Sequence, residues 1–273
     1  MQPRRARGAG RVPRVRPARR RSRTDKYAGG VAGGPDDQPY QAADARDPEA
    51  WRSAATERTK LFFAESIPNP RADVLDIALV AEVAHQVGVP LIVDNTVPSP
   101  YLCRPIEHGA DIVVHSLTKY MGGHGTSVGG AIVDSGKFPW AQHKARFKRL
   151  NEPDVSYHGV VYTEALGPAA YIGRARVVPL RNMGAAISPF NAFLLAQGLE
   201  PLSLRVERHV ANAQKVAEYL EGHEAVKRVY YSGLPSSPCF ERAQKYLPHG
   251  VGSVFSFGVA GGRAAGEAFI ENL

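Results

Sequence analysis

The chain has 273 residues, 44% of them hydrophobic, and no apolar run long enough to cross a membrane, so we expect a soluble globular protein. Its formal net charge is +8, but residues 1–23 hold ten arginines and no acidic residue, and subtracting ten leaves −2 for residues 24–273. The basic character therefore belongs to a tail, which argues against a basic nucleic-acid-binding fold in the rest of the chain.

Residues 1–43 are rich in Arg, Gly and Pro and contain almost no large apolar side chains. Such a composition cannot bury enough surface to offset the entropy of ordering, so we predict a disordered tail. An Arg-rich arm of this kind could contact nucleic acid or another anionic surface. The alternative is that this segment is not the natural start of the domain. No apolar stretch follows the arginines, so we do not expect a secretory signal.

From Asp47 onward, predicted helices alternate with short apolar strands. An Asp-Pro pair begins a helix at 47–54, and residues 74–88 have the spacing of an amphipathic helix that ends at Gly88. A short helix is expected at 104–110, and strands are expected at 61–66, 90–96, 111–116 and 129–136. This alternation predicts an α/β fold with a mostly parallel sheet flanked by helices.

The last third of the chain predicts the start of a smaller α+β domain. Apolar residues from Leu202 to Leu220 fall on one face of a long helix that stops near Gly222. Strands are expected at 226–232 and 252–259, and a further helix is expected from Arg263. We therefore divide the chain into a tail (1–43), a partial large domain (44–190), and a long linking helix with a partial C-terminal domain (191–273).

The two cysteines, Cys103 and Cys239, show no C-x-x-C spacing, so we predict neither a disulfide framework nor a zinc site. A reducing, cytoplasmic setting fits this pattern best. The histidines match no metal-ligand spacing, and no G-x-G-x-x-G motif follows a predicted strand. Neither a metal centre nor a dinucleotide site is therefore expected.

Polar residues gather where three predicted strands end. In an open α/β sheet, ligands bind beyond the carboxyl ends of the strands, so we expect these residues to line one crevice. They are Glu65, Ser66 and Asn69, then Asp94, Asn95 and Thr96, then His115, Ser116, Thr118 and Lys119.

The segment HSLTKYMGGHG (115–125) places a lysine between two hydroxyl residues and a run of glycines. A lysine desolvated at the lip of a crevice can form a Schiff base with an aldehyde, such as that of pyridoxal 5'-phosphate. That cofactor also needs a carboxylate near its pyridine nitrogen and a cradle for its phosphate. Asp94 can be the carboxylate, and Ser116 and Thr118 can donate to the phosphate. The alternatives are an exposed surface lysine, an aspartate that caps a turn, and loop hydroxyls.

The motifs ESIPNP (65–70), VDNT (93–96) and HSLTKYMGGHG together resemble the Cys/Met-metabolism family of fold-type I pyridoxal-phosphate enzymes. Residues 152–171 and 188–221 are most similar to its O-acetylhomoserine sulfhydrylase branch. The resemblance implies an aminotransferase-like sheet in which Lys119 carries the Schiff base and shuttles protons. It also implies that Asp94 faces the ring nitrogen, that Ser116 and Thr118 hold the phosphate, and that Asn69 lies near the cofactor's 3-hydroxyl and the substrate.

The reaction implied by the resemblance is γ-replacement, in which O-acetylhomoserine loses acetate and takes up sulfide or a thiol to give homocysteine or methionine. Its partners would be the amino-acid substrate and the thiol, in a cytoplasmic homodimer or homotetramer with no membrane or nucleic-acid partner. Two alternatives remain open: a pyridoxal-phosphate-dependent cystathionine or methionine γ-lyase, and an inactive fragment with a nucleic-acid-binding arm.

Three departures from the family pattern bear on activity. An N-terminal tyrosine–arginine pair that reaches a neighbouring subunit's phosphate cannot be located in residues 1–43, and the chain stops before the arginine that binds the substrate carboxylate. Pro201 stands where the family usually has threonine. We therefore expect a chain truncated at both ends, with impaired activity because charge-assisted contacts are lost.

Overall fold

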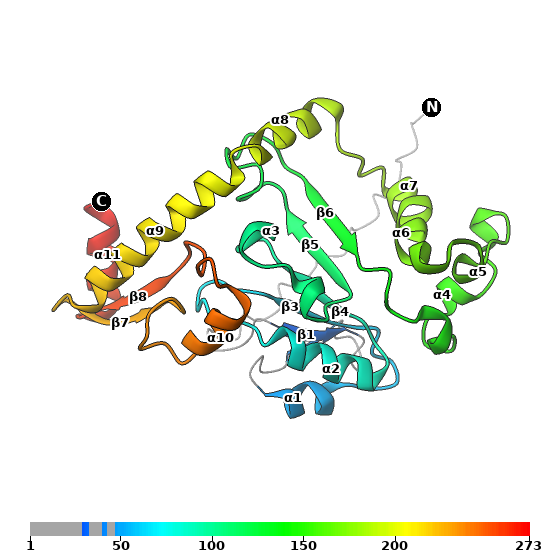
Figure 1. Cartoon of the computed structure of the whole chain (residues 1–273), viewed down its shortest axis with the longest axis horizontal. Coiled ribbons are helices and arrows are strands. Elements are labelled where there is room, and N and C mark those ends of the chain that lie inside the picture. Colours follow the sequence, from blue (N-terminus) through cyan, green and yellow to red (C-terminus); the bar gives the residue numbers. More distant parts are fainter. Residues whose placement is uncertain (1–28, 33–39, 43–46) are drawn as a thin grey trace, which may run out of the picture.

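The computed structural model describes residues 29–32, 40–42 and 47–273 (Figure 1). Its main sheet has six strands in the order β2-β1-β3-β4-β5-β6. The strands are β1 (Gly29–Ala32), β2 (Tyr40–Ala42), β3 (Leu61–Glu65), β4 (Leu91–Asp94), β5 (Ile112–Ser116) and β6 (Gly130–Asp134).

The centre of this sheet is parallel and its margins are antiparallel. Strand β3 pairs in parallel with β4, and β4 pairs in parallel with β5, whereas β6 runs antiparallel to β5. The predicted α/β class is confirmed, and the carboxyl ends of the three central strands meet at one edge. In the β3–β4 register, Glu65 lies opposite Asp94, so the last residues of both strands are neighbours.

Strands β1 and β2 lie within the segment that we expected to be disordered. Strand β1 pairs antiparallel with both β2 and β3. The prediction of disorder is wrong at these two segments, because a ladder of backbone hydrogen bonds needs few large side chains. For residues 1–28 and 33–39 and for residue 43, that prediction lies outside the described residues, as does the proposed anion-binding arm.

The first two helices begin and end at the residues that local chemistry favours. Asp47 caps α1 (Pro48–Ala54) by accepting a hydrogen bond from Glu49 N at 2.9 Å. Helix α2 (Ile77–Val87) ends at Gly88, which adopts a left-handed conformation with φ 78°. Its apolar face is buried against the sheet, as its spacing predicted.

Between β4 and α8 the helices are short, and none of those after β6 was predicted from the sequence. They are α3 (Ser99–Leu102), the 3-10 turns Pro105–His108, Trp140–His143, Val155–Tyr157 and Gly167–Ala169, α4 (Lys148–Asn151), α5 (Tyr162–Leu166), α6 (Ala170–Ala175), a π-helical turn (Arg176–Leu180) and α7 (Arg181–Met183). Trp140, Phe147 and Tyr162 give this region its own apolar cluster, which packs against Ile92 and Ile112 of the sheet.

The C-terminal third contains the predicted long helix, two strands and last helix, together with two helices, Pro189–Leu199 and Phe240–Tyr246, that were not predicted. It comprises α8 (Pro189–Leu199), α9 (Leu202–Glu221), β7 (Val226–Tyr230), α10 (Phe240–Tyr246), β8 (Ser256–Val259) and α11 (Gly262–Glu271). Strands β7 and β8 form a separate antiparallel pair. Helix α9 buries Leu202, Val206, Ala213 and Ala217 against the core that also contains α2. The boundary between large and small domains near residue 190 stays a prediction, because this core runs across it.

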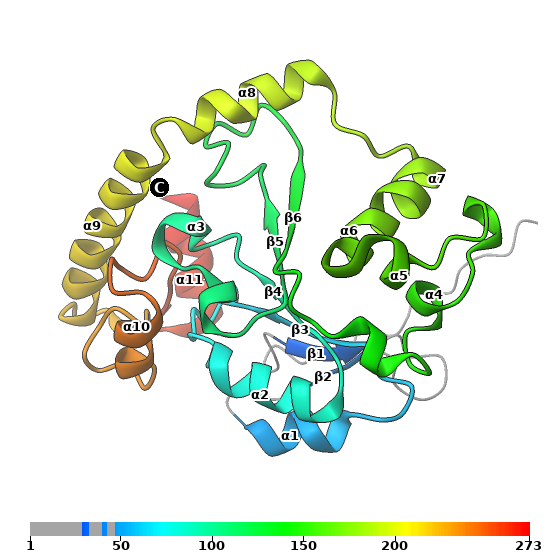
Figure 2. The ribbon, with the colours of Figure 1, turned by 45° about the vertical axis from the view of Figure 1, so that its right-hand side comes forward.

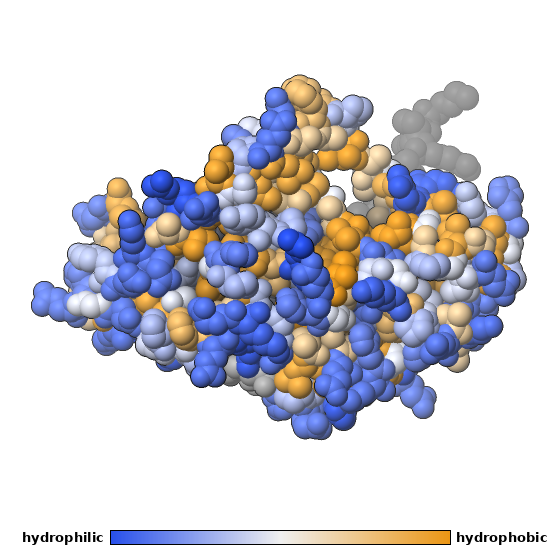
Figure 3. Space-filling model, in the orientation of Figure 1, coloured by the Kyte–Doolittle hydropathy of each residue, from blue (hydrophilic) through white to orange (hydrophobic). Residues whose placement is uncertain are grey.

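Helices α8 and α9 form an arch that passes close to the ends of β5 and β6 (Figures 1 and 2). Apolar residues gather on α8 and in the hollow beneath it (Figure 3). Among the described residues, none of the helices combines the length and the apolar character that crossing a bilayer requires.

Candidate active site

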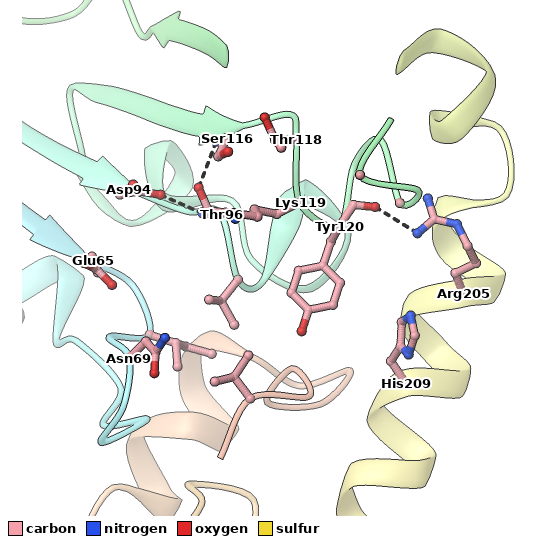
Figure 4. A pocket seen from close by; sticks show the side chains of 15 residues that line it. Glu65, Asn69, Asp94, Thr96, Ser116, Thr118, Lys119, Tyr120, Arg205 and His209 are labelled. Atoms are coloured by element: carbon pink, nitrogen blue, oxygen red, sulfur yellow. Dashed lines mark hydrogen bonds between the residues drawn. The ribbon is translucent and has the colours of Figure 1, made fainter. Parts of the chain in front are cut away.

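A cavity of about 750 Å³ lies beyond the carboxyl ends of β3, β4 and β5 (Figure 4). All five residues singled out from the sequence line it, namely Asn69, Asp94, Ser116, Thr118 and Lys119. They come from three strand ends that are far apart in the chain. The expectation that these ends converge on one crevice agrees with the structure, whereas the roles of the five residues stay predictions.

The carboxylate of Asp94 uses one of its two oxygens to shape the site. Its Oδ1 accepts a hydrogen bond from Thr96 N at 2.9 Å, and Thr96 Oγ1 in turn accepts one from Ser116 N at 2.9 Å. The end of β4 is thereby tied to the end of β5 (Figure 4). Among the described residues, none donates a hydrogen bond to Asp94 Oδ2. Asp94 therefore caps a turn and keeps an oxygen available to a ligand.

Lys119 lies in a tight turn that immediately follows β5. Its N–H donates to Ser116 O at 3.2 Å, and its carbonyl accepts from Gly123 N at 2.8 Å. Gly123 has φ 76°, a conformation that a glycine adopts at little cost. The expected desolvation of Lys119 is not found, because its side chain is exposed where the cavity opens to solvent.

The two hydroxyl residues beside Lys119 differ in their surroundings. Ser116 Oγ has no hydrogen-bond partner within the part of the chain that the structure describes, so it is free to donate. Thr118 Oγ1 accepts from Gly129 N at 3.1 Å and lies 3.4 Å from Gly129 O. Thr118 thus ties the Lys119 turn to Gly129, the residue before β6. The Thr118 hydroxyl donates only in the longer, weaker contact with Gly129 O.

Three of the polar residues expected in the crevice, Ser66, Asn95 and His115, do not line the cavity, because each is next in the chain to a strand-end residue that does and successive side chains of a strand alternate between faces. Ser66 Oγ donates to Asn95 Oδ1 at 2.9 Å, and Asn95 Nδ2 donates to Cys103 O at 2.8 Å. Burial lowers the pKa of His115, which favours its neutral form. The neighbours Glu65 and Asp94 face the cavity, whereas Ser66, Asn95 and His115 support it from behind.

Glu65 lines the cavity as expected from the sequence, which assigned it no role. It is half-buried beside Asp94, and its pKa is raised first by burial and then by the charge of Asp94, while a hydrogen bond from the Asn69 backbone opposes the shift. Its position at a strand end was a signal in the sequence. Only the register of β3 against β4 shows that it shares a face with Asp94.

Helix α9 supplies two further cavity residues that no sequence pattern identified. Arg205 and His209 lie one helical turn apart and both line the cavity (Figure 4). Arg205 Nη1 donates to Tyr120 O at 2.9 Å, across 85 positions of the chain. The His209 ring meets the Tyr120 ring edge to face at 5.8 Å. No local motif predicts contacts between segments so far apart.

Comparisons with known proteins agree with this geometry. Residues 39–273 match the family described as Cys/Met metabolism PLP-dependent enzyme. The chain is 49% identical over 239 residues to the O-acetyl-L-homoserine sulfhydrylase of Leptospira meyeri, covering 84% of this chain and 54% of that protein. It is 53% identical over 217 residues to the homocysteine synthase of Schizosaccharomyces pombe, covering 79% and 51%.

A crystal structure from Campylobacter jejuni has the same fold over most of the chain. That protein is described as an O-acetylhomoserine (thiol)-lyase with N'-pyridoxyl-lysine-5'-monophosphate, and it superposes with a TM-score of 0.75 at 36% identity, covering 80% of this chain and 54% of that one. The chain spans about half the length of the curated relatives that it matches. The family match over residues 39–273 and the 49% identity to the Leptospira protein show that the chain belongs to the Cys/Met metabolism family of pyridoxal-phosphate-dependent enzymes.

Proposed function

We propose that the chain binds pyridoxal 5'-phosphate in the cavity around Lys119 and takes part in γ-replacement on O-acetylhomoserine. The observation that carries this proposal is the convergence of an amine, a carboxylate and hydroxyl groups on one cavity, on Lys119, Asp94, Ser116 and Thr118. The names of the relatives from Leptospira and Schizosaccharomyces support the choice of reaction. The net change would convert O-acetylhomoserine and sulfide into homocysteine and acetate.

The polar groups of the cavity fit this cofactor. Asp94 Oδ2 is open to a cationic partner, and the Ser116 hydroxyl is open to an anionic one. A pyridine nitrogen that stays protonated needs the first, and a phosphate needs the second. Asn69 would stay within reach of the ring's 3-hydroxyl and the substrate, since it lines the same cavity.

When bound, pyridoxal phosphate supplies an aldehyde and an electron-withdrawing ring. The residues of the chain would then divide the remaining work. Lys119 Nζ would hold the aldehyde carbon and move a proton at the substrate's Cα. The Asp94 carboxylate would keep the proton on the ring nitrogen, and Ser116 and Thr118 would fix the phosphate.

Absorbance spectroscopy tests this proposal. Adding pyridoxal phosphate to the purified chain should produce a band near the edge of the visible range that depends on Lys119. Lys119→Ala should abolish the band, and Lys144→Ala, which changes an exposed lysine of another loop, should keep it. A chain that stays colourless in excess cofactor would contradict the proposal.

We also propose a cytoplasmic setting and assembly into a homodimer or homotetramer. Both cysteines are unpaired and buried, which suits a reducing compartment. Helix α8 exposes Phe190 and Phe193 at 68% and 56%, and single chains rarely expose neighbouring aromatic side chains to this extent. Burial of this face against a second copy would remove that apolar surface from water.

A further inference from the structure

The guanidinium of Arg205 binds the backbone directly after Lys119. Its Nη1 donates to Tyr120 O at 2.9 Å, and its Nη2 donates to Met121 O at 3.3 Å and to Gly198 O at 2.6 Å. Three carbonyl groups from two segments are thus bridged by one side chain. The planar guanidinium reaches them through two nitrogen atoms held in a fixed geometry, whereas a lysine would offer a single ammonium on a flexible stem.

The partners of Arg205 are neutral. Within the described part of the chain, no carboxylate lies within 4.0 Å of its nitrogens. Arg205 also lies near the N-terminal end of α9, where the helix dipole disfavours a cation. Neither an ion pair nor the helix therefore accounts for its position, and the carbonyl groups of the Lys119 turn do.

The turn packs closely against both Arg205 and the end of α8. A Cβ atom on Gly123 would lie 2.5 Å from Arg205 Cζ. A Cβ atom on Gly198 would lie 2.1 Å from Gly122 O, so the end of α8 meets the turn backbone to backbone. The glycines of the turn allow the guanidinium and α8 to approach it closely.

A second contact from α9 holds the same turn. His209 packs against the Tyr120 ring at 5.8 Å, and the Tyr120 hydroxyl lies 2.7 Å from Ser253 Oγ. Tyr120 is therefore fixed at its carbonyl by Arg205 and at its ring by His209 and Ser253. Because Lys119 is bonded to Tyr120, these contacts also restrict the position of the Lys119 backbone.

We infer that Arg205 is a positioning residue for Lys119. It holds the turn 119–123 against the junction of α8 and α9, so that the amine stays on the cavity wall with Asp94. The inference rests on the proposed function in so far as the amine is held for pyridoxal phosphate. Arg205 acts through the backbone of Tyr120 and Met121 and needs no contact with the cofactor.

Amide hydrogen exchange in the cofactor-free protein tests the inference without relying on activity. The N–H groups of Gly122 and Gly123 donate to Leu117 O and Lys119 O, both at 2.8 Å, and report on the closure of the turn. Arg205→Lys should speed their exchange at least about tenfold, since it removes charge-assisted hydrogen bonds. Arg208→Lys, on an exposed position of the same helix, should leave it unchanged.

Cofactor affinity supplies the second readout. Arg205→Lys should raise the Kd for pyridoxal phosphate about tenfold, measured by the Lys119-dependent absorbance, while Arg208→Lys should match the wild type. Exchange of the buried α2 amides checks that each variant is folded, and Arg205→Gln replaces Arg205→Lys if the latter is not.

The exchange rates and the Kd test separate parts of the inference. Unchanged exchange at Gly122 and Gly123 would overturn the inference. Faster exchange with an unchanged Kd would overturn the positioning role and leave Arg205 as a structural residue only. A wild-type chain without a Lys119-dependent band would contradict the proposed function, and the exchange rates would still decide whether Arg205 holds the turn.

Discussion

Glu65 and Asp94 are paired residues at the carboxyl ends of β3 and β4, and both side chains line the cavity that contains Lys119. Burial, and then the negative charge of the neighbouring Asp94, raise the pKa of the half-buried Glu65. The cavity therefore contains Asp94, with one hydrogen-bonded oxygen, and beside it Glu65, whose pKa is raised above its ordinary value. This division of roles leads to separate predictions for the two acids.

Asp94→Asn should weaken binding of pyridoxal phosphate about tenfold to a hundredfold, because it removes a charge-assisted contact worth ~1.5–3 kcal/mol. The amide keeps an oxygen that can accept from Thr96 N, so the turn should survive. A fluorescence or absorbance titration measures the change. Asp73→Asn, outside the cavity, is the control. Equal affinity in Asp94→Asn and the control would rule out Asp94 as the partner of the ring nitrogen.

Glu65→Gln should make the protein less sensitive to rising pH. The folded chain raises the pKa of Glu65, so it binds this proton more tightly than the unfolded chain does. The resulting stability is present at low pH and is lost as the pH rises above the ordinary value of 4.5 and through the folded pKa. Melting temperatures from about pH 4 to about pH 7 should therefore fall for the wild type relative to Glu65→Gln. Parallel curves for the two proteins would show that Glu65 ionises freely.

His85 provides a second pH-dependent contact, at the opposite end of the sheet. Its Nε2 lies 2.9 Å from Asp111 Oδ2, and Asp111 Oδ2 also accepts from Leu91 N at 2.8 Å. The hydrogen bond to Asp111 raises the pKa of His85, and burial opposes the shift.

Because the pKa of His85 is raised, its contact with Asp111 stabilises the folded protein most at low pH. The contribution of His85 is fully present below the ordinary value of 6.5 and is lost as the pH rises through the folded pKa. His85→Gln should therefore destabilise the protein more at about pH 6 than at about pH 8. His249→Gln, at an exposed position, is the control. An equal loss at both pH values would mean that the imidazole is not charged in this contact.

Gly198→Ala should destabilise the protein by about 1–3 kcal/mol, because the new Cβ would overlap the Gly122 carbonyl across the α8–turn contact. Gly266→Ala is a matched helix control, since its Cβ would have 4.0 Å to Val259 Cγ2. That substitution should stabilise the protein by up to about 1 kcal/mol through helix propensity. Urea unfolding measures both, and a Gly198→Ala variant as stable as Gly266→Ala would mean that the contact is loose.

If α8 forms an interface between copies, changing its exposed aromatic residues should lower the mass of the particle in solution. Replacing Phe190 and Phe193 with serine removes the exposed aromatic side chains of α8. The double variant should shift the wild-type oligomer toward the monomer in sedimentation velocity, because the apolar area buried between copies is lost. A wild-type chain that sediments as a monomer at tens of micromolar would remove the proposal.

The sequence predicted the elements whose signals are local. Asp47 and Gly88 marked helix ends through capping chemistry, and the apolar runs before Asp94 and Ser116 marked the central strands. Because parallel strands share a carboxyl edge, these local signals were enough to bring five candidate residues to one cavity.

The features that the sequence missed depend on distant partners. Strand β1 pairs with the edge of β3 and β2 pairs with β1, and no side-chain pattern in the sequence indicates either pairing. The contact between Arg205 and Tyr120 depends on how α9 crosses the turn, which periodicity cannot give. Lys119 was expected to be desolvated but is exposed, because a position after a strand end does not predict how far a cavity opens to solvent.

Borohydride reduction followed by peptide mapping tests the central claim most directly. Incubation with pyridoxal phosphate and reduction should leave one pyridoxyl group, on the peptide that contains Lys119, in the wild type and in Arg208→Lys. Asp94→Asn should lower the yield at limiting cofactor. A pyridoxyl group found mainly on other lysines, or on none, would contradict it.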